Sequence, residues 1–155
     1  MTQESSITDE MRAAIGVQSE PAFNEVEKGA IRKFAQAVGD PNPLWQDEEH
    51  AKKGPHGRIV APPTFLVTMT SGRSNRPAGA TARPAMRRGL LDGGAEWEFY
   101  VPVGPGDVIK CTSALADLYE RPGRMGTMLF TVTEQTYTNQ KGELVAKRRG
   151  TVITF

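Results

Sequence analysis

With 155 residues, the chain is long enough to form one ordinary domain around its own hydrophobic core. Its hydrophobic content of 38% and charged content of 24% are typical of a soluble globular protein. A formal net charge of +1 excludes a broad electrostatic attraction to nucleic acid or to acidic membranes, so we expect neither as a partner.

The single cysteine and the first residues of the chain further narrow the possible class and location of the protein. Cys111 has no second cysteine for a disulfide, and no zinc-ligand spacing is present, so no metal is expected. The opening MTQESSITDE lacks the basic and apolar regions of a signal peptide, and no run approaches the ~20 apolar residues that cross a bilayer. We therefore expect a cytoplasmic protein in which Cys111 is a small buried residue.

Helical patterns come first along the chain. Residues 6–16 predict a short amphipathic helix, capped by Ser6 or Thr8, because an apolar residue recurs at every fourth position. A brief extended piece follows over residues 21–27. Residues 28–40 predict a second helix with one buried face. That face carries Ile31, Phe34, Ala35 and Val38.

The next stretch, DPNPLWQD over residues 40–47, contains two prolines that force a turn or an extended backbone. Residues 47–53 form at most a short polar helix. Residues 61–72, APPTFLVTMTSG, begin with prolines that suit the first turn of a helix. We expect this helix to be buried, because apolar residues cover most of its circumference. They are Phe65, Leu66, Val67 and Met69.

Residues 71–89 are rich in Gly, Pro, Ser and Arg and predict a mobile loop. Arg83, Arg87 and Arg88 form a basic cluster there, and residues 147–149 form another. Runs of like charge usually form solvated surface, which is the simpler interpretation. The alternative is a landing site for phosphate groups, which arginine side chains bind well.

From Leu90 onward the hydrophobic period changes to two, which is typical of β-strands. Within residues 95–103, Trp97, Phe99 and Val101 share one face. The motifs GPGD, RPGRMG and NQKG predict turns between the later strands. Those strands are expected over residues 107–120, 127–138 and 143–155.

Helices followed by a meander of long antiparallel strands indicate an α+β fold. The apolar helix has to be covered, and a sheet wrapped around one buried central helix is the natural packing. We expect one domain over residues 1–155. Because such a sheet leaves an edge strand unpaired, we also expect a dimer formed edge to edge.

Three motifs together carry a likeness to a known family. IRKFAQAVGDPNPLW is followed by GRIVAPPTF and later by EWEFYVPVGPGD. In this combination the chain, from about Val26 to Phe155, resembles the MaoC-like (R)-specific enoyl-CoA hydratases and 3-hydroxyacyl-thioester dehydratases. The resemblance implies the hot-dog fold. For active members it also implies reversible addition of water across the C2–C3 bond of an acyl thioester.

The resemblance further implies which positions carry the chemistry. Active members have the patterns D-x-N-P-x-H and I-V-H-G. Their Asp and His bind the reacting water and share its protons, and the Gly N–H stabilises charge on the thioester oxygen. Here Asp40 and Asn42 match the first pattern, but Trp45 replaces its histidine. Ala61 and Pro62 replace the His-Gly of the second pattern.

Each replacement removes a chemical function. An indole has no basic nitrogen, so Trp45 cannot accept a proton, and Pro62 has no backbone N–H to donate. The pattern resembles the degenerate N-terminal-type, FAS1-like dehydratase half of double hot-dog members, in which one half binds the acyl chain. The resemblance therefore implies a substrate-binding subunit, weak or inactive alone, that pairs with a catalytic hot-dog hydratase subunit. No cofactor is expected beyond the CoA or acyl carrier protein that carries the acyl thioester.

The candidate residues also have structural interpretations. Asp40 and Asn42 are common turn formers, and Trp45 can fill space in a core. His56, in the glycine-rich GPHGR, is the second catalytic candidate because it could swing toward Asp40 and restore acid–base function. The predicted substrate-binding set is Asn42, Trp45, Ala61, Pro62, Arg87 and Arg88, the two arginines for CoA phosphates.

Three alternatives remain open. The first is a self-sufficient homodimeric (R)-hydratase that uses Asp40 with His56. The second is a hot-dog acyl-CoA thioesterase, since one carboxylate can activate a water for thioester hydrolysis. The third is a non-enzymatic acyl-CoA-binding or structural subunit. The acyl length, CoA versus acyl carrier protein, and homodimer versus heterodimer are equally open.

Overall fold

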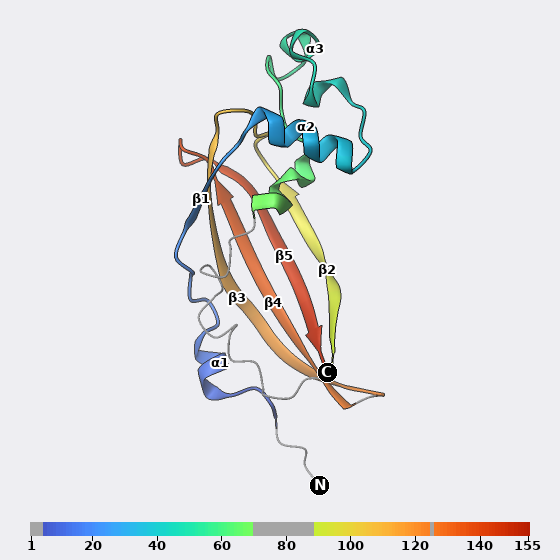
Figure 1. Ribbon diagram of the computed structural model, residues 1–155. Helices are drawn as coiled ribbons and strands as arrows, with labels where there is room; N and C mark the ends of the chain where they lie inside the picture. The colour runs from blue at the N-terminus through green and yellow to red at the C-terminus, as the bar shows by residue number, and fades with distance from the viewer. Residues whose placement is uncertain (1–4, 70–88, 125) are drawn as a thin grey trace.

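The computed structural model describes residues 5–69, 89–124 and 126–155. Within these ranges the chain forms a five-stranded antiparallel sheet with short helices gathered mainly at one end of it (Figure 1). The mobile loop predicted over residues 71–89 lies outside the described residues, except for Gly89.

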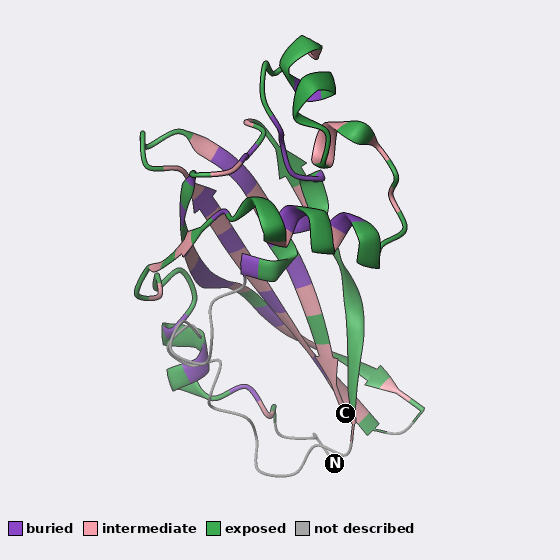
Figure 2. Ribbon diagram, turned by 45° about the horizontal axis from the view of Figure 1, so that its top comes forward, coloured by how far each residue is buried: buried purple, intermediate pink, exposed green. Residues whose placement is uncertain are grey.

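The strands lie in the order β1-β3-β4-β5-β2, and every neighbouring pair is antiparallel. Their bounds are β1 Ala22–Glu25, β2 Leu90–Phe99, β3 Val108–Gly123, β4 Gly126–Thr138 and β5 Leu144–Thr154. The long strand β2 is one edge of the sheet and is exposed along almost its whole length (Figure 2). This edge offers backbone hydrogen-bonding groups that no described strand uses.

Five described helical segments precede β2. They are α1 Asp9–Ala13, α2 Lys28–Ala37, the 3-10 helix η1 Pro43–Trp45, α3 Glu48–Lys53 and the 3-10 helix η2 Pro63–Met69. Of the two predicted caps, Thr8 is the one used: its Oγ1 accepts the Met11 N–H at 3.2 Å. No helix in the described ranges is long and apolar enough to span a membrane.

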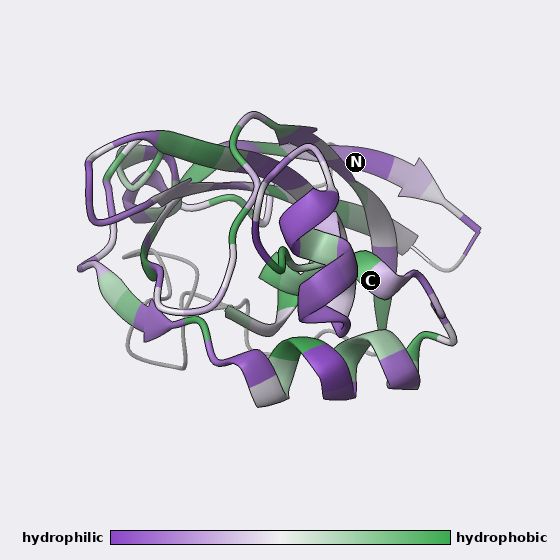
Figure 3. Ribbon diagram, turned by 90° about the horizontal axis from the view of Figure 1, so that it is seen from above, coloured by the Kyte–Doolittle hydropathy of each residue, from purple (hydrophilic) through white to green (hydrophobic). Residues whose placement is uncertain are grey.

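Helix α2 is amphipathic and crosses the end of the sheet above η2 (Figures 1 and 3). Ile31 and Ala35 are buried, and Phe34 packs edge-on against Phe65 with ring centroids 5.6 Å apart. Val38, predicted for this buried face, is instead 55% exposed. The helix ends at Ala37, so Val38 is already its C-cap residue and turns away from the core.

The face of the sheet that η2 covers, called here the inner face, carries two separate apolar clusters. The larger lies beneath α2 and η2, and the smaller lies beneath α1. The sheet residues of the larger cluster include Ile109, Cys111, Tyr137, Val145 and Ala146. The smaller cluster consists of Ile7, Met11, Ala14, Leu115, Leu118 and Leu129. Cys111 is fully buried, which confirms its expected structural role.

The central helix differs from the one expected over residues 61–72. Its described part is a 3-10 helix, and only Phe65, Leu66 and Met69 are buried in it. Val67 is 45% exposed, so the prediction of apolar burial around most of the helix is wrong for this residue. In a 3-10 helix the side chains at i and i+3 eclipse, so Leu66 and Met69 share a side and Val67 turns outward.

The β3–β4 connection is also tighter than the turn predicted over residues 121–126. Strand β3 continues to Gly123 and β4 begins at Gly126, with Pro122 opposite Thr127. Proline is tolerated there because β1, the other neighbour of β3 in the described sheet, pairs with it only from Val108 to Cys111, far from Pro122. Phe99 shares the face of Trp97 as predicted, since their rings stack with centroids 5.4 Å apart, yet it is 45% exposed because it belongs to the edge strand.

Replacing Ile109 with Ala tests the inner face. Ile109 is fully buried, so the cavity left by Ile109→Ala should lower the free energy of unfolding by about 2–4 kcal/mol. The neighbouring Val108 points to the opposite face and is 36% exposed, so Val108→Ala should cost less than about 1 kcal/mol. Urea unfolding followed by circular dichroism measures both values. Equal losses would contradict this assignment of the faces.

Candidate functional site

The two stretches that carry the family motifs lie side by side. The Val60 N–H donates to the Leu44 carbonyl at 3.4 Å, which places Trp45 and Ala61 on neighbouring segments. The first stretch is set by Gly39, whose φ of 70° ends α2 and lets the Asp40 N–H bond to the Ala35 carbonyl at 2.9 Å. Helix termination therefore fixes where the DPNPLW segment begins.

Asp40 and Asn42 both have the structural role of turn residues. Asp40 Oδ1 accepts the Asn42 N–H at 3.0 Å, and Asn42 Oδ1 accepts the Leu44 N–H at 3.0 Å, which caps η1. Both side chains are half-buried. Asp40 retains its second oxygen, Oδ2, for which no described residue supplies a hydrogen bond.

Trp45 packs partly buried against the larger apolar cluster. Its Nε1 atom is buried, and no acceptor for its hydrogen lies within bonding distance among the described residues. A buried donor without a partner is unusual, because it loses its hydrogen bonds to water. The position that holds a proton acceptor in the active family pattern thus holds a free donor here.

Ala61 and Pro62 are both buried at the start of η2. The Ala61 N–H is already used, since it donates to the Val103 carbonyl at 2.8 Å, and Pro62 has no N–H. Neither residue can therefore donate a main-chain hydrogen bond to a thioester oxygen.

The remaining predicted site residues are not joined to this group. His56 is exposed, and none of the hydrogen bonds or ion pairs of the described residues links it to Asp40. Arg87 and Arg88 lie outside the described residues. Within the described ranges, no cluster of His, Cys, Asp and Glu could hold a metal ion.

A hollow of about 300 Å³ lies beside Trp45, and the motifs gave no indication of it. Its lining consists of Lys28, Gly29, Arg32, Trp45 and Gln46. Lys28 is ion-paired with Glu48, whereas no described carboxylate pairs with Arg32. The spacing of Lys28 and Arg32, four residues apart on α2, is the sequence signal that places both cations on one helix face.

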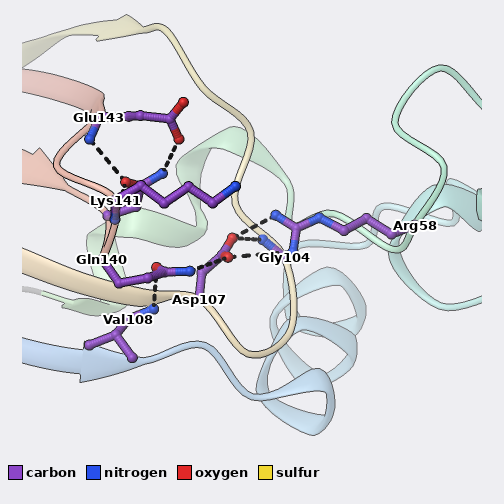
Figure 4. Close-up of polar contacts among 8 residues, drawn as sticks. Arg58, Gly104, Asp107, Val108, Gln140, Lys141 and Glu143 are labelled. Carbon is purple, nitrogen blue, oxygen red and sulfur yellow. Dashed lines mark hydrogen bonds and ion pairs between the residues drawn. The ribbon is translucent and has the colours of Figure 1, made fainter.

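An ion pair between Arg58 and Asp107 holds the second motif in place (Figure 4). Arg58 Nη2 donates to Asp107 Oδ2 at 2.7 Å, and the Gly104 N–H donates to the same oxygen at 2.8 Å. Gln140 Nε2 donates to Asp107 Oδ1 at 3.3 Å. A Cβ on Gly104 would lie 2.5 Å from the Ile59 carbonyl oxygen, so only glycine allows this close approach.

Two opposing effects act on the pKa of Asp107. Burial raises it, while hydrogen bonds from Arg58, Gly104 and Gln140 and the charge of Arg58 lower it more strongly. The net result is a pKa below the usual value of 3.8. The folded state therefore favours the ionised carboxylate.

Comparison with known proteins identifies the family. The family model described as FAS1-like, dehydratase domain region, matches residues 13–148. A UPF0336 protein of Parafrankia sp. (strain EAN1pec) is 37% identical over 123 residues, which cover 79% of each chain. A probable enoyl-CoA hydratase alpha subunit of Thermomonospora curvata is 30% identical over 142 residues, covering 81% of this chain and 43% of that protein.

A solved structure gives the same answer for the fold. The C-terminally truncated HadBC (3R-hydroxyacyl-ACP dehydratase) complex of Mycobacterium tuberculosis contains a chain that matches with a TM-score of 0.73 and 25% identity. The match covers 95% of this chain and 98% of that chain. The chain therefore belongs to the FAS1-like dehydratase domain region family and has the MaoC-like hot-dog fold. The family resemblance and the predicted fold class are confirmed.

Replacing Asp107 with Asn should lower the free energy of unfolding by about 1–3 kcal/mol at neutral pH, because a buried network loses its charged acceptor. With a folded-state pKa below 3.8, the carboxylate stabilises the fold above its unfolded-state pKa. That contribution is lost as the pH falls through the folded-state pKa. Urea unfolding across the acid range should therefore show a shallower pH dependence for Asp107→Asn than for the wild type.

The matched control is Asp92→Asn, which removes the same charge from an exposed residue whose Oδ1 accepts the Gly94 N–H and no other hydrogen bond from the described residues. It should change stability by less than about 0.5 kcal/mol. Equal losses in the two variants would show that Asp107 is not a structural centre.

Proposed function

We propose that this chain is the substrate-binding, catalytically degenerate subunit of a two-subunit acyl-thioester hydratase or dehydratase. The substrates are enoyl or (R)-3-hydroxyacyl thioesters of CoA or of acyl carrier protein, and no further cofactor takes part. The observation that carries the proposal is the buried indole N–H of Trp45, which stands where an active member of the family has a base.

The chemistry of hydration explains why the indole of Trp45 is the main evidence for the proposal. Water addition needs a group that accepts a proton from the reacting water, and an indole nitrogen cannot do so. It also needs donors for the charge that develops on the thioester oxygen. Pro62 has none and the N–H of Ala61 is occupied. Loss of one such donor alone typically lowers a rate by about 10²–10³-fold.

The shell of the binding site is nevertheless retained. Apolar side chains of α2 and η2 cover the inner face, and the Arg58–Asp107 pair holds the entry to η2. Among similar proteins, one is a probable enoyl-CoA hydratase alpha subunit and another belongs to a dehydratase complex of two named components. These names support a division of labour between this chain and a catalytic hot-dog subunit.

Strand β2 is the surface that we propose for subunit contact. It is an edge strand, and Leu90, Leu91, Phe99 and the adjoining Tyr100 expose between 45% and 54% of their surface. A partner strand that pairs with β2 would satisfy its backbone groups and cover these side chains. A second copy of the chain could use the same edge, which would give the homodimer of the self-sufficient alternative.

The alternatives make different demands on the same residues. A self-sufficient hydratase needs His56 near Asp40, whereas a thioesterase needs only Asp40 and a water. A purely structural subunit needs no contact between Trp45 and the substrate. Activity and binding of matched variants therefore separate them.

The decisive assay follows the loss of the enoyl-thioester absorbance of crotonyl-CoA, first with the purified chain and then with its partner subunit. The chain alone should be at least about a hundredfold slower than the complex, because the histidine and the oxyanion donor of the active family pattern are both replaced. In the complex, Trp45→Ala should raise KM several-fold with little change in kcat, since it removes substrate contact area.

Three further measurements test the alternatives. Full activity of the chain alone that falls in His56→Ala would establish the self-sufficient hydratase. Release of free CoA, detected with a thiol reagent and abolished by Asp40→Asn, would establish a thioesterase. An unchanged KM in Trp45→Ala would leave only a structural subunit.

Leu91→Lys tests the proposed contact surface, because a lysine on an edge strand opposes strand pairing. Leu91 is 52% exposed, so the variant should fold normally yet weaken subunit association by about tenfold or more. Val38→Lys is the control, since Val38 is 55% exposed but lies at the C-cap of α2 rather than on the edge strand. Native mass spectrometry over a dilution series measures both. Undisturbed association in Leu91→Lys would rule out the β2 edge.

A further inference from the structure

A row of polar side chains crosses the inner face between its two apolar clusters. Ser113, Gln135, Arg148 and Trp97 stand opposite one another on β3, β4, β5 and β2. On one side the next row contains Cys111 and Tyr137 of the larger cluster, and on the other it contains Leu115 of the smaller. We call this row the polar belt. It is the reason that the apolar core is divided in two.

Arg148 is the centre of the polar belt, and its neighbours hold it in one position. Its Nη1 donates to Gln135 Oε1 at 3.0 Å, and its guanidinium carbon lies 5.7 Å from the centre of the Trp97 ring. A Cβ on Gly150 would lie 2.7 Å from Nη1, so the guanidinium occupies the space that a side chain there would fill. Residues on three strands thus hold this cation in place.

The basic run of residues 147–149 was expected to be solvated surface, and this is wrong for Arg148. Side chains alternate along a strand, so Arg148 points inward while Lys147 and Arg149 point outward. Arg149 pairs with Glu134 at 3.8 Å on the outer face. No carboxylate among the described residues pairs with Arg148.

The polar belt presents hydrogen-bond donors that have no acceptors. Arg148 Nε is buried and has no partner. Gln135 is 7% exposed, and its Oε1 already accepts from both Arg148 and the Tyr137 hydroxyl, the latter at 3.4 Å. Its amide NH₂ group finds no acceptor among the described residues. Arg148 as a whole is half-buried, but a buried N–H such as its Nε is costly unless something supplies an oxygen acceptor.

We propose that Arg148 and Gln135, against the wall of Trp97, recognise an oxygen acceptor on the acyl group of the ligand, and that this acceptor is a carboxylate. A carboxylate fits best because the guanidinium is a planar cation without a counter-ion and binds carboxylates through two parallel hydrogen bonds. The inference rests on the proposed binding of acyl thioesters. It adds that the acyl chain carries an acidic group away from the thioester.

Geometry supports this location for the far end of an acyl group. Next to the polar belt, Tyr137 and Ala146 form an apolar floor beneath η2. Tyr137 lies two residues after Gln135 on β4, and Ala146 lies two residues before Arg148 on β5. The polar belt therefore marks the place where this apolar floor ends on the inner face. An alkyl end would meet unsatisfied donors there, whereas a carboxylate would satisfy them.

Calorimetric titration with two matched series of acyl-CoA tests the inference, using the complex if the chain is purified with a partner. One series carries plain acyl groups of six to twelve carbons and the other carries a carboxylate at the far end of the same chains. At least one carboxylated member should bind about tenfold or more tightly than its plain counterpart, as expected for charge-assisted hydrogen bonds. Arg148→Met should abolish this preference.

Arg149→Met is the matched control, because it removes the same charge from the adjacent residue on the outer face and should keep the preference. Should Arg148→Met fail to fold, Gly150→Ala retains the arginine but displaces its guanidinium, and it should also lose the preference. The inference is overturned if no carboxylated member is preferred, or if Arg148→Met or Gly150→Ala preserves the preference. Plain acyl-CoA binding without a carboxylate preference would leave the proposed function intact, whereas absence of all acyl-CoA binding would refute both.

Discussion

The buried carboxylate of Asp107 joins the segments that shape the site. Its hydrogen bonds reach Arg58, which leads into the second motif, and Gly104 and Gln140 in two separate turns. The Ala61 N–H is bonded to the carbonyl of Val103, next to Gly104, so η2 begins where this network allows it to begin. A carboxylate satisfied by several donors is stable when buried, but it becomes costly as soon as one partner is lost. The start of η2 therefore depends on a polar contact rather than on apolar packing alone.

Much of the fold could be predicted from the sequence because its signals are local. The switch from a helical to an alternating period placed the strands, and the turn motifs placed two of their three connections. The misplaced residues depend on distant partners. Pro122 is accepted within β3 because β1 pairs with β3 only as far as Cys111, and Val67 is exposed because η2 winds as a 3-10 helix. The local sequence pattern predicts neither the length of a neighbouring strand nor the winding of a short helix.

The candidate site likewise combines residues whose chemistry the local sequence predicts with contacts that depend on residues distant in the sequence. The chemistry of Trp45 and Pro62 could be judged from their side chains alone, once the motifs had been aligned with the family pattern. The Arg58–Asp107 pair joins residues that no motif connects, and the hollow beside Trp45 needs the packing of η1 against α2. Arg148 is an intermediate case. Strand alternation would have placed it on the inner face, but its place within a basic run favoured the solvated interpretation.

The polar groups of the interior share one property that bears on function. Trp45 Nε1, Arg148 Nε and the Gln135 amide are donors without described acceptors, and Asp40 already uses one oxygen within its own turn. A site built for hydration must accept a proton, whereas a site built to hold a ligand rich in oxygen must donate hydrogen bonds. An interior supplied with donors, in which a tryptophan replaces the histidine of the active family pattern, is therefore suited to holding and orienting such a ligand. If a neighbouring subunit supplies the base, ligand binding and proton transfer lie on separate chains. The hydrogen-bond donors along the binding surface of this chain then neither protonate nor block the catalytic group.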